Sequence, residues 1–293
     1  MSAPALPEPV APGVMRLLAP NPSPMTFRGT NSYLVGDTRL AVIDPGPDLP
    51  AHLEALLAAI AGRPVDAILV THAHRDHSAL SPSLAAATGA PVLAYGPASA
   101  GRSPVMARLA AEGLTAGGVD EAFRPDRRLT DGEAISGPGW SLETLWTPGH
   151  MGNHLSFRLD DIIFTGDVAM GWASSIVAPP DGDVSQFLAS CRRLCALSPR
   201  RLLPGHGEPV EKPAERLSWL IRHRERRAAQ ILSALSDGPL TVDDLTTRLY
   251  GDMAWSLRAA AAQNVFAHLI DLVEKEVVAT MPRLASDARF QCR

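Results

Sequence analysis

The segment from Thr71 to His77 constrains this chain more than any other part of it. Its pattern is H-x-H-x-D-H, with three histidines and one aspartate within six residues. The apolar run 65–71 before it is typical of a buried strand, so we expect the cluster on the loop at that strand's end. Imidazole and carboxylate are the ligands that divalent zinc and its neighbours prefer. On such a loop His72 and His74 lie on one side, while Asp76 and His77 turn toward a second position, which suits two metal ions side by side.

Two more of the nine histidines occupy Gly-His turns after apolar runs. His150 follows the run 142–146, and His206 follows Leu202-Leu203. Both are therefore expected at the same edge as the first cluster. Between them Asp167 ends the run 162–166, where its carboxylate can bridge two metals. Alone, an aspartate at a strand end is usually a turn former or a helix N-cap, but in this company we interpret it as a ligand.

Taken in order over residues 28 to 210, these motifs resemble the metallo-β-lactamase superfamily of metal hydrolases. Ile43-Asp44-Pro45-Gly46 resembles the first motif of that superfamily. The resemblance implies that Asp44 stands behind the metal site and helps to fix the ligand loop by a hydrogen bond. It also implies two ligand groups and one bridge: His72, His74 and His150 for one metal; Asp76, His77 and His206 for the other; and Asp167 between them.

These ligands imply a hydrolase with two divalent metal ions, expected to be zinc, with iron and manganese also suited. A water that bridges two such ions has its pKa lowered toward about 7, so a metal-bridging hydroxide is the expected nucleophile. Asp76 is expected to orient this hydroxide and to pass a proton to the leaving group. For His154 two roles stay open: it donates to an oxyanion, or it is a hydrogen-bonded neighbour of the ligands.

Size and charge describe an ordinary globular chain of 293 residues, with room for one large domain and a small one. The formal net charge of −4 supplies no general attraction to nucleic acid or anionic lipid. Residues 1–13 are proline-rich and are expected to form a flexible tail. They lack the cationic start and apolar stretch of a signal peptide, and no apolar run is long enough to span a membrane, so we expect a cytoplasmic protein without membrane contact.

Residues 14–212 are expected to form an α/β hydrolase domain, because short strands alternate there with helices. The resemblance makes this an αββα sandwich with the metals at one edge. The local patterns predict a hairpin of 31–35 with 40–44, a strand at 91–95, and helices at 51–61, 83–87 and 184–197. Asp183 is the expected N-cap of the last helix.

Residues 213–293 are expected to form a small winged-helix domain. Their patterns predict an arginine-rich helix over 214–235, a helix capped by Thr241, a helix over 256–273, and a terminal hairpin. With the segments 21–35 and 71–78, this tail resembles the β-lactamase-like protein 2 group. We expect it to shape the substrate cleft, and we expect a chain ended after residue 212 to keep its metals. Trp172 is a candidate for the opposite wall of the cleft, although a buried structural role is also open.

Three substrate classes remain open from the sequence. The β-lactamase-like protein 2 resemblance implies an endoribonuclease-like enzyme acting on single-stranded RNA. The net acidity and the lack of a basic, aromatic-interleaved stretch favour a thioesterase or esterase of the glyoxalase II type acting on a small acyl substrate. A DNA-binding regulator is disfavoured, since the candidate recognition helix has a single arginine and an apolar surface. β-Lactam hydrolysis is not expected, because true β-lactamases of this family carry Cys or Ser where this chain has Asp167.

Overall fold

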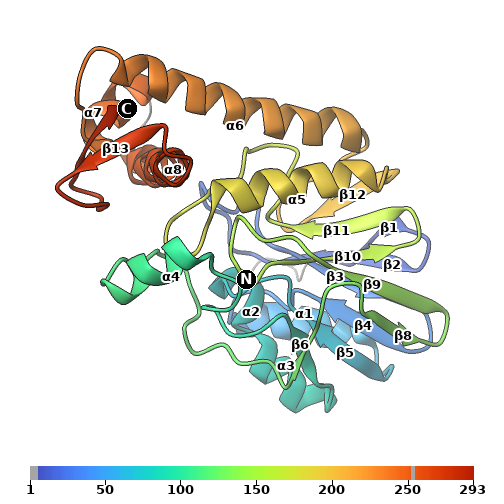
Figure 1. The fold of residues 1–293 in the computed structure, drawn as a ribbon. Coiled ribbons are helices and arrows are strands. Elements are labelled where there is room, and N and C mark those ends of the chain that lie inside the picture. The colour runs from blue at the N-terminus through green and yellow to red at the C-terminus, as the bar shows by residue number, and fades with distance from the viewer. Residues whose placement is uncertain (1–5, 252–254) are drawn as a thin grey trace.

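The computed structural model describes residues 6–251 and 255–293. Its larger part contains two mixed β-sheets packed face to face (Figure 1). The first sheet has the order β1 (Glu8–Ala11), β2 (Val14–Leu18), β3 (Asn31–Val35), β4 (Leu40–Ile43), β5 (Val65–Leu69), β6 (Val92–Ala94) and β7 (Arg127–Arg128). The second has the order β12 (Arg201–Pro204), β11 (Ile162–Gly166), β10 (Leu155–Leu159), β9 (Trp140–Trp146) and β8 (Ala134–Gly137).

Helices cover the outer face of each sheet. Figure 1 shows α1 (Pro50–Ile60), α2 (Arg75–Ser78) and α3 (Ser81–Thr88) beside the first sheet. On the far side, α5 (Val184–Ala196) covers the second sheet. The helices 51–61, 83–87 and 184–197 that the sequence predicts are thus confirmed with small shifts of their ends, and so is the antiparallel pairing of β3 with β4.

The strands of the first sheet are apolar on both faces because both faces are covered. On β4, Leu40 and Val42 pack toward α1 and α3, whereas Ala41 and Ile43 pack between the two sheets. This alternation follows from the two-residue period of a strand. Four layers result, helix–sheet–sheet–helix, which confirms the expected αββα sandwich.

The N-terminus differs from the prediction of a flexible tail over residues 1–13. Residues 8–11 form β1, which pairs antiparallel with β2 at the edge of the first sheet. Val10 is buried in the layer between the sheets. The expectation was wrong for this segment because prolines are tolerated on an edge strand, where one row of N–H groups needs no partner.

The C-terminal unit is a winged helix, as the sequence predicts. It contains α6 (Pro213–Leu235), α7 (Val242–Tyr250), α8 (Trp255–Glu274) and the hairpin of β13 (Val278–Met281) with β14 (Arg289–Cys292). The Thr241 hydroxyl accepts from the Asp244 N–H and the Asp244 carboxylate accepts from the Thr241 N–H, so a capping box begins α7. Asp183 caps α5 in a similar way, accepting from the N–H of Gln186 at 3.0 Å.

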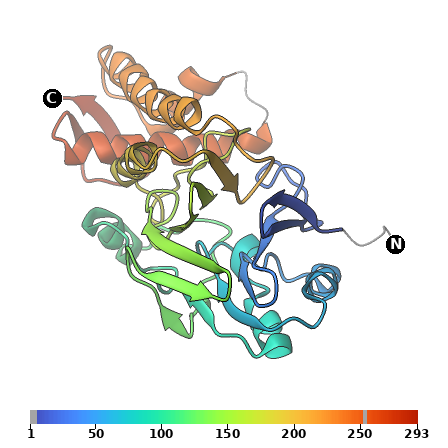
Figure 2. The same ribbon diagram turned by 90° about the vertical axis from the view of Figure 1, so that its right-hand side faces the viewer.

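The C-terminal unit lies on the α5 side of the sandwich, where α6 runs along α5 (Figures 1 and 2). The first half of α6 packs into the layer beside α5 through Leu217 and Leu220, and its second half enters the C-terminal core through Ile231 and Leu235. α6 begins at Pro213, beside the predicted domain boundary. Because α6 contributes side chains to both hydrophobic cores, the structure does not divide the chain at one residue. The domain boundary between residues 212 and 213 therefore stays a prediction.

Residues of α4 (Pro104–Ala111) join the C-terminal core from the hydrolase part. Within residues 6–251 and 255–293, no helix is long and apolar enough to cross a membrane.

Candidate metal centre

The strand ends of both sheets bring seven side chains to one edge of the sandwich. His72 and His74 follow β5, Asp167 follows β11, and His206 follows β12. The segment expected as a loop contains a helical turn, α2, which carries Asp76 and His77. His150 comes from the turn after β9. All seven predicted ligands meet here because the carboxyl ends of neighbouring strands lie at one sheet edge.

Three histidines form the first group. The Nδ1 atom of His74 lies 3.0 Å from the Nε2 atom of His72 and 3.0 Å from the Nε2 atom of His150. His72 and His150 are buried, and His74 is nearly so. Three nitrogen atoms therefore point at one small volume.

The second group contains Asp76, His77 and His206, with Asp167 between the groups. The Nε2 atoms of His77 and His206 lie 3.3 Å apart. The Asp76 Oδ2 atom is 3.2 Å from His206 Nε2 and 3.5 Å from His77 Nε2. Asp167 reaches both groups, since its oxygens lie 3.6 Å from His77 Nε2, 3.3 Å from His206 Nε2 and 3.7 Å from His150 Nε2.

The second nitrogen of several ligand rings identifies the tautomer. The Nδ1–H of His77 donates to the Asp44 carboxylate at 2.8 Å, that of His150 to the Ile176 carbonyl at 2.7 Å, and that of His206 to the Gly29 carbonyl at 3.1 Å. These acceptors hold a proton on Nδ1, so Nε2 is the ring atom that faces the site and is available to a metal. This is the arrangement by which proteins orient histidine ligands.

Asp44 joins both ligand groups, in agreement with its predicted place behind the metal site. Its carboxylate accepts from the Thr71 N–H at 2.7 Å and from the Thr71 hydroxyl at 2.8 Å, besides His77. Because the Thr71 hydroxyl donates its proton to Asp44, its oxygen Oγ1 can only accept a hydrogen bond from His72. The donor is the Nδ1–H of His72, at 3.0 Å. One buried carboxylate thus orients His77 directly and His72 through Thr71.

Electrostatics separate the two groups. Burial, reinforced by neighbouring imidazoles, holds the pKa of His72 well below its usual value and lowers that of His74 to about 3. Burial alone would also lower the pKa of His206, but Asp167 and Asp76 outweigh it and raise this pKa to about 9. Burial would also lower the pKa of His77, but the carboxylates of Asp76, Asp167 and Asp44 outweigh burial and raise this pKa well above its usual value. A metal in the second group therefore has to displace protons, whereas the first group is already neutral.

The donor set fits two metal ions. Ligand atoms about 2.0–2.2 Å from one tetrahedral ion lie roughly 3.3–3.6 Å apart. The separations within the two groups and across Asp167, from 3.0 to 3.7 Å, are close to that spacing. In addition, the Asp167 Oδ1 atom is buried without a hydrogen-bond donor among the described residues. A carboxylate oxygen in that state suits a cation.

His154 does not face the site as an oxyanion donor. Its Nε2 atom accepts from the Asp167 N–H at 3.1 Å, and its Nδ1 atom lies 3.0 Å from the Thr147 hydroxyl. Its ring stacks on His72 at 5.0 Å between centroids. Both ring nitrogens are therefore used within the protein. Of the two roles left open by the sequence, the structure favours the neighbour that positions ligands.

A cavity of about 410 Å³ opens above the ligands. Its remaining wall comes from distant segments, including α8. This wall is mainly apolar, with Met25, Met170, Ile176, Ala259 and Ala260, and it also contains the polar Gln263. Trp172 lines a neighbouring cavity and stacks on Phe27 at 5.0 Å, so it is not the wall of the metal cavity that the sequence suggested. The sequence predicts that the winged helix shapes the substrate cleft, and Ala259, Ala260 and Gln263 of α8 do line this cavity, although the sequence does not single out these residues.

Asp181 also lines the cavity and was missed. Burial raises its pKa despite the Arg102 guanidinium 2.5 Å away. The only signal in the sequence is the Pro-Pro-Asp-Gly-Asp run that ends at Asp183.

The C-terminal unit also holds the loop behind the ligands. Buried Arg224 of α6 donates to the carbonyls of Ser174 and Ser175, at 2.9 and 2.7 Å, and to Asn264 Oδ1 at 2.7 Å. Asn264 of α8 also accepts from the Val177 N–H at 3.1 Å. The same loop supplies the Ile176 carbonyl that orients His150, and the Ser175 hydroxyl donates to the Asp167 carbonyl at 2.6 Å. Two ligands therefore depend on a loop held by α6 and α8.

Comparisons with known proteins agree with this architecture. The model of the metallo-beta-lactamase superfamily matches residues 25–206, and that of the beta-lactamase associated winged helix domain matches residues 241–283. A Drosophila melanogaster protein named beta-lactamase-like protein 2 homolog is 30% identical over 276 residues, which are 90% of this chain and 88% of that protein. The atrochrysone carboxyl ACP thioesterase of Aspergillus fumigatus is 30% identical over 247 residues, 80% of this chain and 70% of the relative.

A solved structure shares the whole architecture. It is a metallo-beta-lactamase family protein from Thermus thermophilus, 28% identical, with a TM-score of 0.78 over 97% of this chain and 100% of the other. The four-layer sandwich, the candidate ligands at its edge and the winged helix thus agree with the two family matches. Together these matches cover more than half of the chain. The chain therefore belongs to the metallo-beta-lactamase superfamily and is a metal-dependent hydrolase.

Proposed function

We propose that this protein hydrolyses a thioester or ester of a small apolar acyl compound at a two-metal centre. The observation that carries this proposal is the cavity over the ligands. It is small, about 410 Å³, and methionine, isoleucine and alanine side chains line most of the wall that the ligands leave. Cavities of this size and character bind small molecules.

The proposed roles of the chain's own groups follow from their positions. His72, His74 and His150 would hold one metal, Asp76, His77 and His206 would hold the other, and Asp167 would lie between the two. Two divalent ions supply an activated water and polarise the carbonyl of the substrate. His77 and His206 hold the pKa of Asp76 well below its usual value against the effect of burial, so Asp76 is a carboxylate at neutral pH.

Asp76 is also the most exposed of the charged groups in the site, with 27% of its side chain accessible. The Thr30 hydroxyl donates to it at 3.3 Å. Asp76 is therefore placed to orient a water and to pass its proton to the leaving thiol or alcohol.

The name of the Aspergillus fumigatus relative supports this class of substrate, since that protein is described as a thioesterase acting on an acyl carrier protein. Asp167 at the bridging position argues against β-lactam hydrolysis as the main activity.

Cleavage of single-stranded RNA is the second candidate. It is favoured by the stacked pair of Phe27 and Trp172, which are 42% and 37% exposed and offer the aromatic faces that unpaired bases use. Most cations beside this pair are already occupied: Lys212 is paired with Glu215, and Arg216 donates to the Met170 and Ala173 carbonyls. Arg227, in the cavity that Trp172 lines, is the exception among the described residues. Arg16 and Arg28 are paired with Glu208, and Arg224 is buried on backbone carbonyls. The acyl substrate is therefore the better supported candidate.

Sequence-specific DNA binding is not part of the proposal. A recognition helix has to enter the major groove, whereas Ala259, Ala260 and Gln263 of α8 face the metal cavity.

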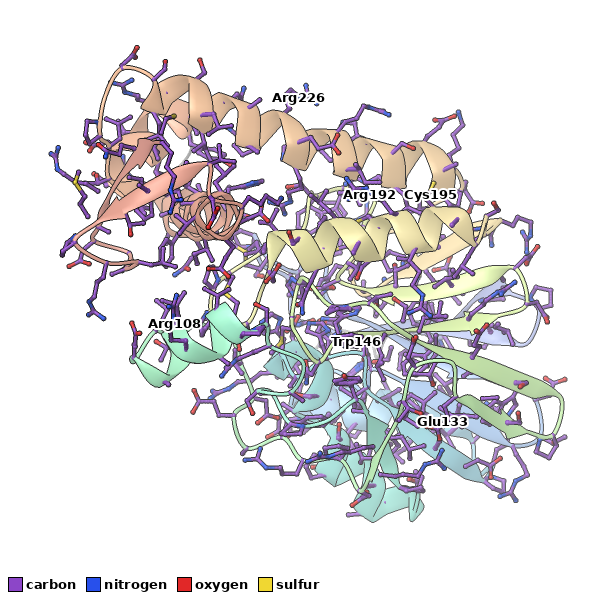
Figure 3. All side chains as sticks on the ribbon, in the orientation of Figure 1. Arg108, Glu133, Trp146, Arg192, Cys195 and Arg226 are labelled. Atoms are coloured by element: carbon purple, nitrogen blue, oxygen red, sulfur yellow. The ribbon has the colours of Figure 1, made fainter. Side chains whose placement is uncertain are left out.

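The test is a panel of substrates offered to the metal-loaded enzyme: acetyl and decanoyl thioesters of N-acetylcysteamine, a decanoyl ester and an unstructured RNA. We expect turnover of the thioesters, its loss in Asp167→Ala, and no effect of Arg226→Met, an exposed residue on the outer face of α6 (Figure 3). Cleavage of the RNA by an enzyme inert toward every thioester and ester would overturn the proposal.

A further inference from the structure

A second cavity of about 520 Å³ lies beside the metal cavity. We propose that it binds the body of the acyl group, and that Arg227 at its end binds an oxyanion, a carboxylate or phenolate, carried at the far end of that group. This inference rests on the proposed thioesterase or esterase function and adds the substrate class: acyl compounds with an apolar body and a remote negative charge.

The two cavities adjoin each other. They share four wall residues, and the proposal places a passage between the cavities at these side chains: Met25, Met170, Ile176 and Ala260. A substrate with its carbonyl at the metals can therefore extend past these side chains into the second cavity. Ala260, on α8, is the smallest of the four, so the width of the passage depends on it.

The second cavity has an apolar and aromatic wall. Trp172 and Leu257 line it beyond the passage, and Tyr250 lines it near the C-terminal end of α7. Its volume is within the range of roughly 300–1,000 Å³ found for cavities that bind drug-sized molecules. A chain of methylene groups or a ring system is the chemistry that such a wall prefers, since only apolar surface is desolvated without loss of hydrogen bonds.

Three basic side chains of the described residues line the second cavity: His223, Arg224 and Arg227. Burial and the neighbouring Arg224 lower the pKa of His223 to about 4, so it is neutral at physiological pH. Both terminal nitrogens of Arg224 are used on protein acceptors. Within the described part of the chain, Arg227 has neither an ion pair nor a hydrogen-bond acceptor, and its guanidinium lies 4.1 Å from the Tyr250 ring centroid. A guanidinium in a largely apolar cavity is a forked donor that matches a carboxylate.

Binding measured without turnover tests the anion site. The probes are the free dicarboxylates from hexanedioate to dodecanedioate and the monocarboxylates of equal length, titrated calorimetrically into the metal-loaded protein. We expect one chain length at which the dicarboxylate binds about tenfold or more tightly than its monocarboxylate, because a charge-assisted hydrogen bond is added. Arg227→Met should abolish this difference, and Arg227→Lys should restore part of it. The matched control is Arg226→Met, which removes an exposed arginine on the outer face of the same helix. Equal binding of both acids to the wild-type protein at every length, or a difference that survives Arg227→Met, overturns the anion site.

Turnover tests the passage. Ala260→Phe should lower kcat/KM for the decanoyl thioester about 30-fold more than it lowers that for the acetyl thioester, since Ala260 lines both cavities and a bulky side chain there also narrows the route to the second one. Ala259→Phe is the comparison, because Ala259 lines the metal cavity alone and should affect both thioesters alike. Equal losses for both thioesters in Ala260→Phe contradict the inference about the second cavity while leaving the thioesterase function intact. An enzyme that hydrolyses neither thioester contradicts the proposed function instead, and the dicarboxylate titration still decides the anion site.

Discussion

At the scale of single residues, the metal edge is organised by buried groups that never touch substrate. Asp44 is the clearest case, with a backbone φ of 51° and a carboxylate that accepts from Thr71 and His77. Such a left-handed conformation is uncommon outside glycine and is tolerated best by Asp and Asn. The residue that fixes the ligand rings thus also bends the chain away from β4 toward α1.

Asp44→Asn should weaken metal binding by about 10–100-fold, as loss of a partner behind a ligand typically does. The amide keeps the size and tolerates the backbone, but its charge is gone and it cannot accept all three hydrogen bonds in the same way. Chelator competition with zinc measures the effect. Asp66→Asn on β5, which removes the ion-pair partner of Arg39, is the control. Equal zinc affinity of Asp44→Asn and the wild-type protein would show that the ligands orient themselves.

A second single-residue prediction concerns His268 on α8. Its side chain is fully buried, and neither ring nitrogen has a hydrogen-bond partner among the described residues. Burial holds the pKa of this imidazole well below its usual value, so the folded protein keeps it neutral while the unfolded chain protonates it below about pH 6.5. The folded pKa of a base is depressed here, so the contribution to stability is present above pH 6.5 and is lost as the pH falls below it.

His268→Leu should therefore raise the free energy of unfolding by about 1–3 kcal/mol at neutral pH, because an unsatisfied polar group is removed. The gain should be larger at low pH than at neutral pH. Urea unfolding of the two proteins on either side of pH 6.5 measures this. Leu269→Ala, at a buried neighbour, should instead lose about 2–5 kcal/mol equally at both pH values. A gain for His268→Leu that does not grow on acidification would contradict the argument.

At the scale of elements, α6 and α8 act as supports for the ligand loop 174–177. Arg224 is a buried cation that donates to two carbonyls and one amide, and Asn264 joins it to the Val177 N–H. The sequence predicts an arginine-rich helix but does not tell which of its arginines are buried. Arg226 is exposed, whereas Arg224 is 2% exposed.

Asn264→Leu should destabilise the protein by about 3–5 kcal/mol, since it leaves a buried charge with one acceptor fewer. It should also lower zinc affinity, because the loop that carries the Ile176 carbonyl loses an anchor. Asn264→Asp, which keeps the acceptor oxygen, should recover the zinc affinity, whereas Gln263→Ala serves as the adjacent control. Thermal unfolding and zinc titration are measured together. Lower stability with unchanged zinc affinity would mean that α8 supports the fold but not the ligands.

At the scale of the whole molecule, the hydrolase sandwich and the winged helix share their cores. Leu217 and Leu220 of α6 cover the layer that contains Phe187 and Cys191 of α5. In the other direction, Met106 of α4 enters the C-terminal core. The winged helix is thus packed against the sandwich through shared apolar cores and is not a separate appended domain.

A chain ended after residue 212 should consequently fail to keep its metals, contrary to the expectation drawn from the sequence alone. It exposes the apolar face of α5 and removes both Arg224 and Asn264. A chain ended after Ser236 retains α6 and Arg224 and should be intermediate in solubility and zinc content. Size-exclusion chromatography with zinc analysis compares the two with the full chain. A monomeric chain of residues 1–212 with full zinc content would restore the original expectation.

The sequence by itself indicated the candidate ligands, and its resemblance to a known family indicated the four-layer fold. The ligand side chains lie within a contiguous motif or in turns that follow apolar strands, and strand ends meet at one edge whatever the loops between them do. The same local logic identified the caps at Asp183 and Thr241. The helical turn at Arg75–Ser78 and the edge strand at 8–11 were not predicted from the sequence. The local patterns there are weak, so strand pairing and tertiary packing determine the structure of these two segments.

Only the tertiary structure decided what surrounds the metals. The bond from Val177 to Asn264 spans 87 positions, and no local pattern records it. The tertiary packing turns α8 toward the cavity, buries Arg224 against backbone carbonyls, and occupies both nitrogens of His154. Candidate ligands can be recognised in short motifs because each follows the end of a strand, four of them the end of β5. The cavity is lined by segments that are far apart in the sequence, including α8. Its shape therefore depends on tertiary packing, which no local sequence pattern records.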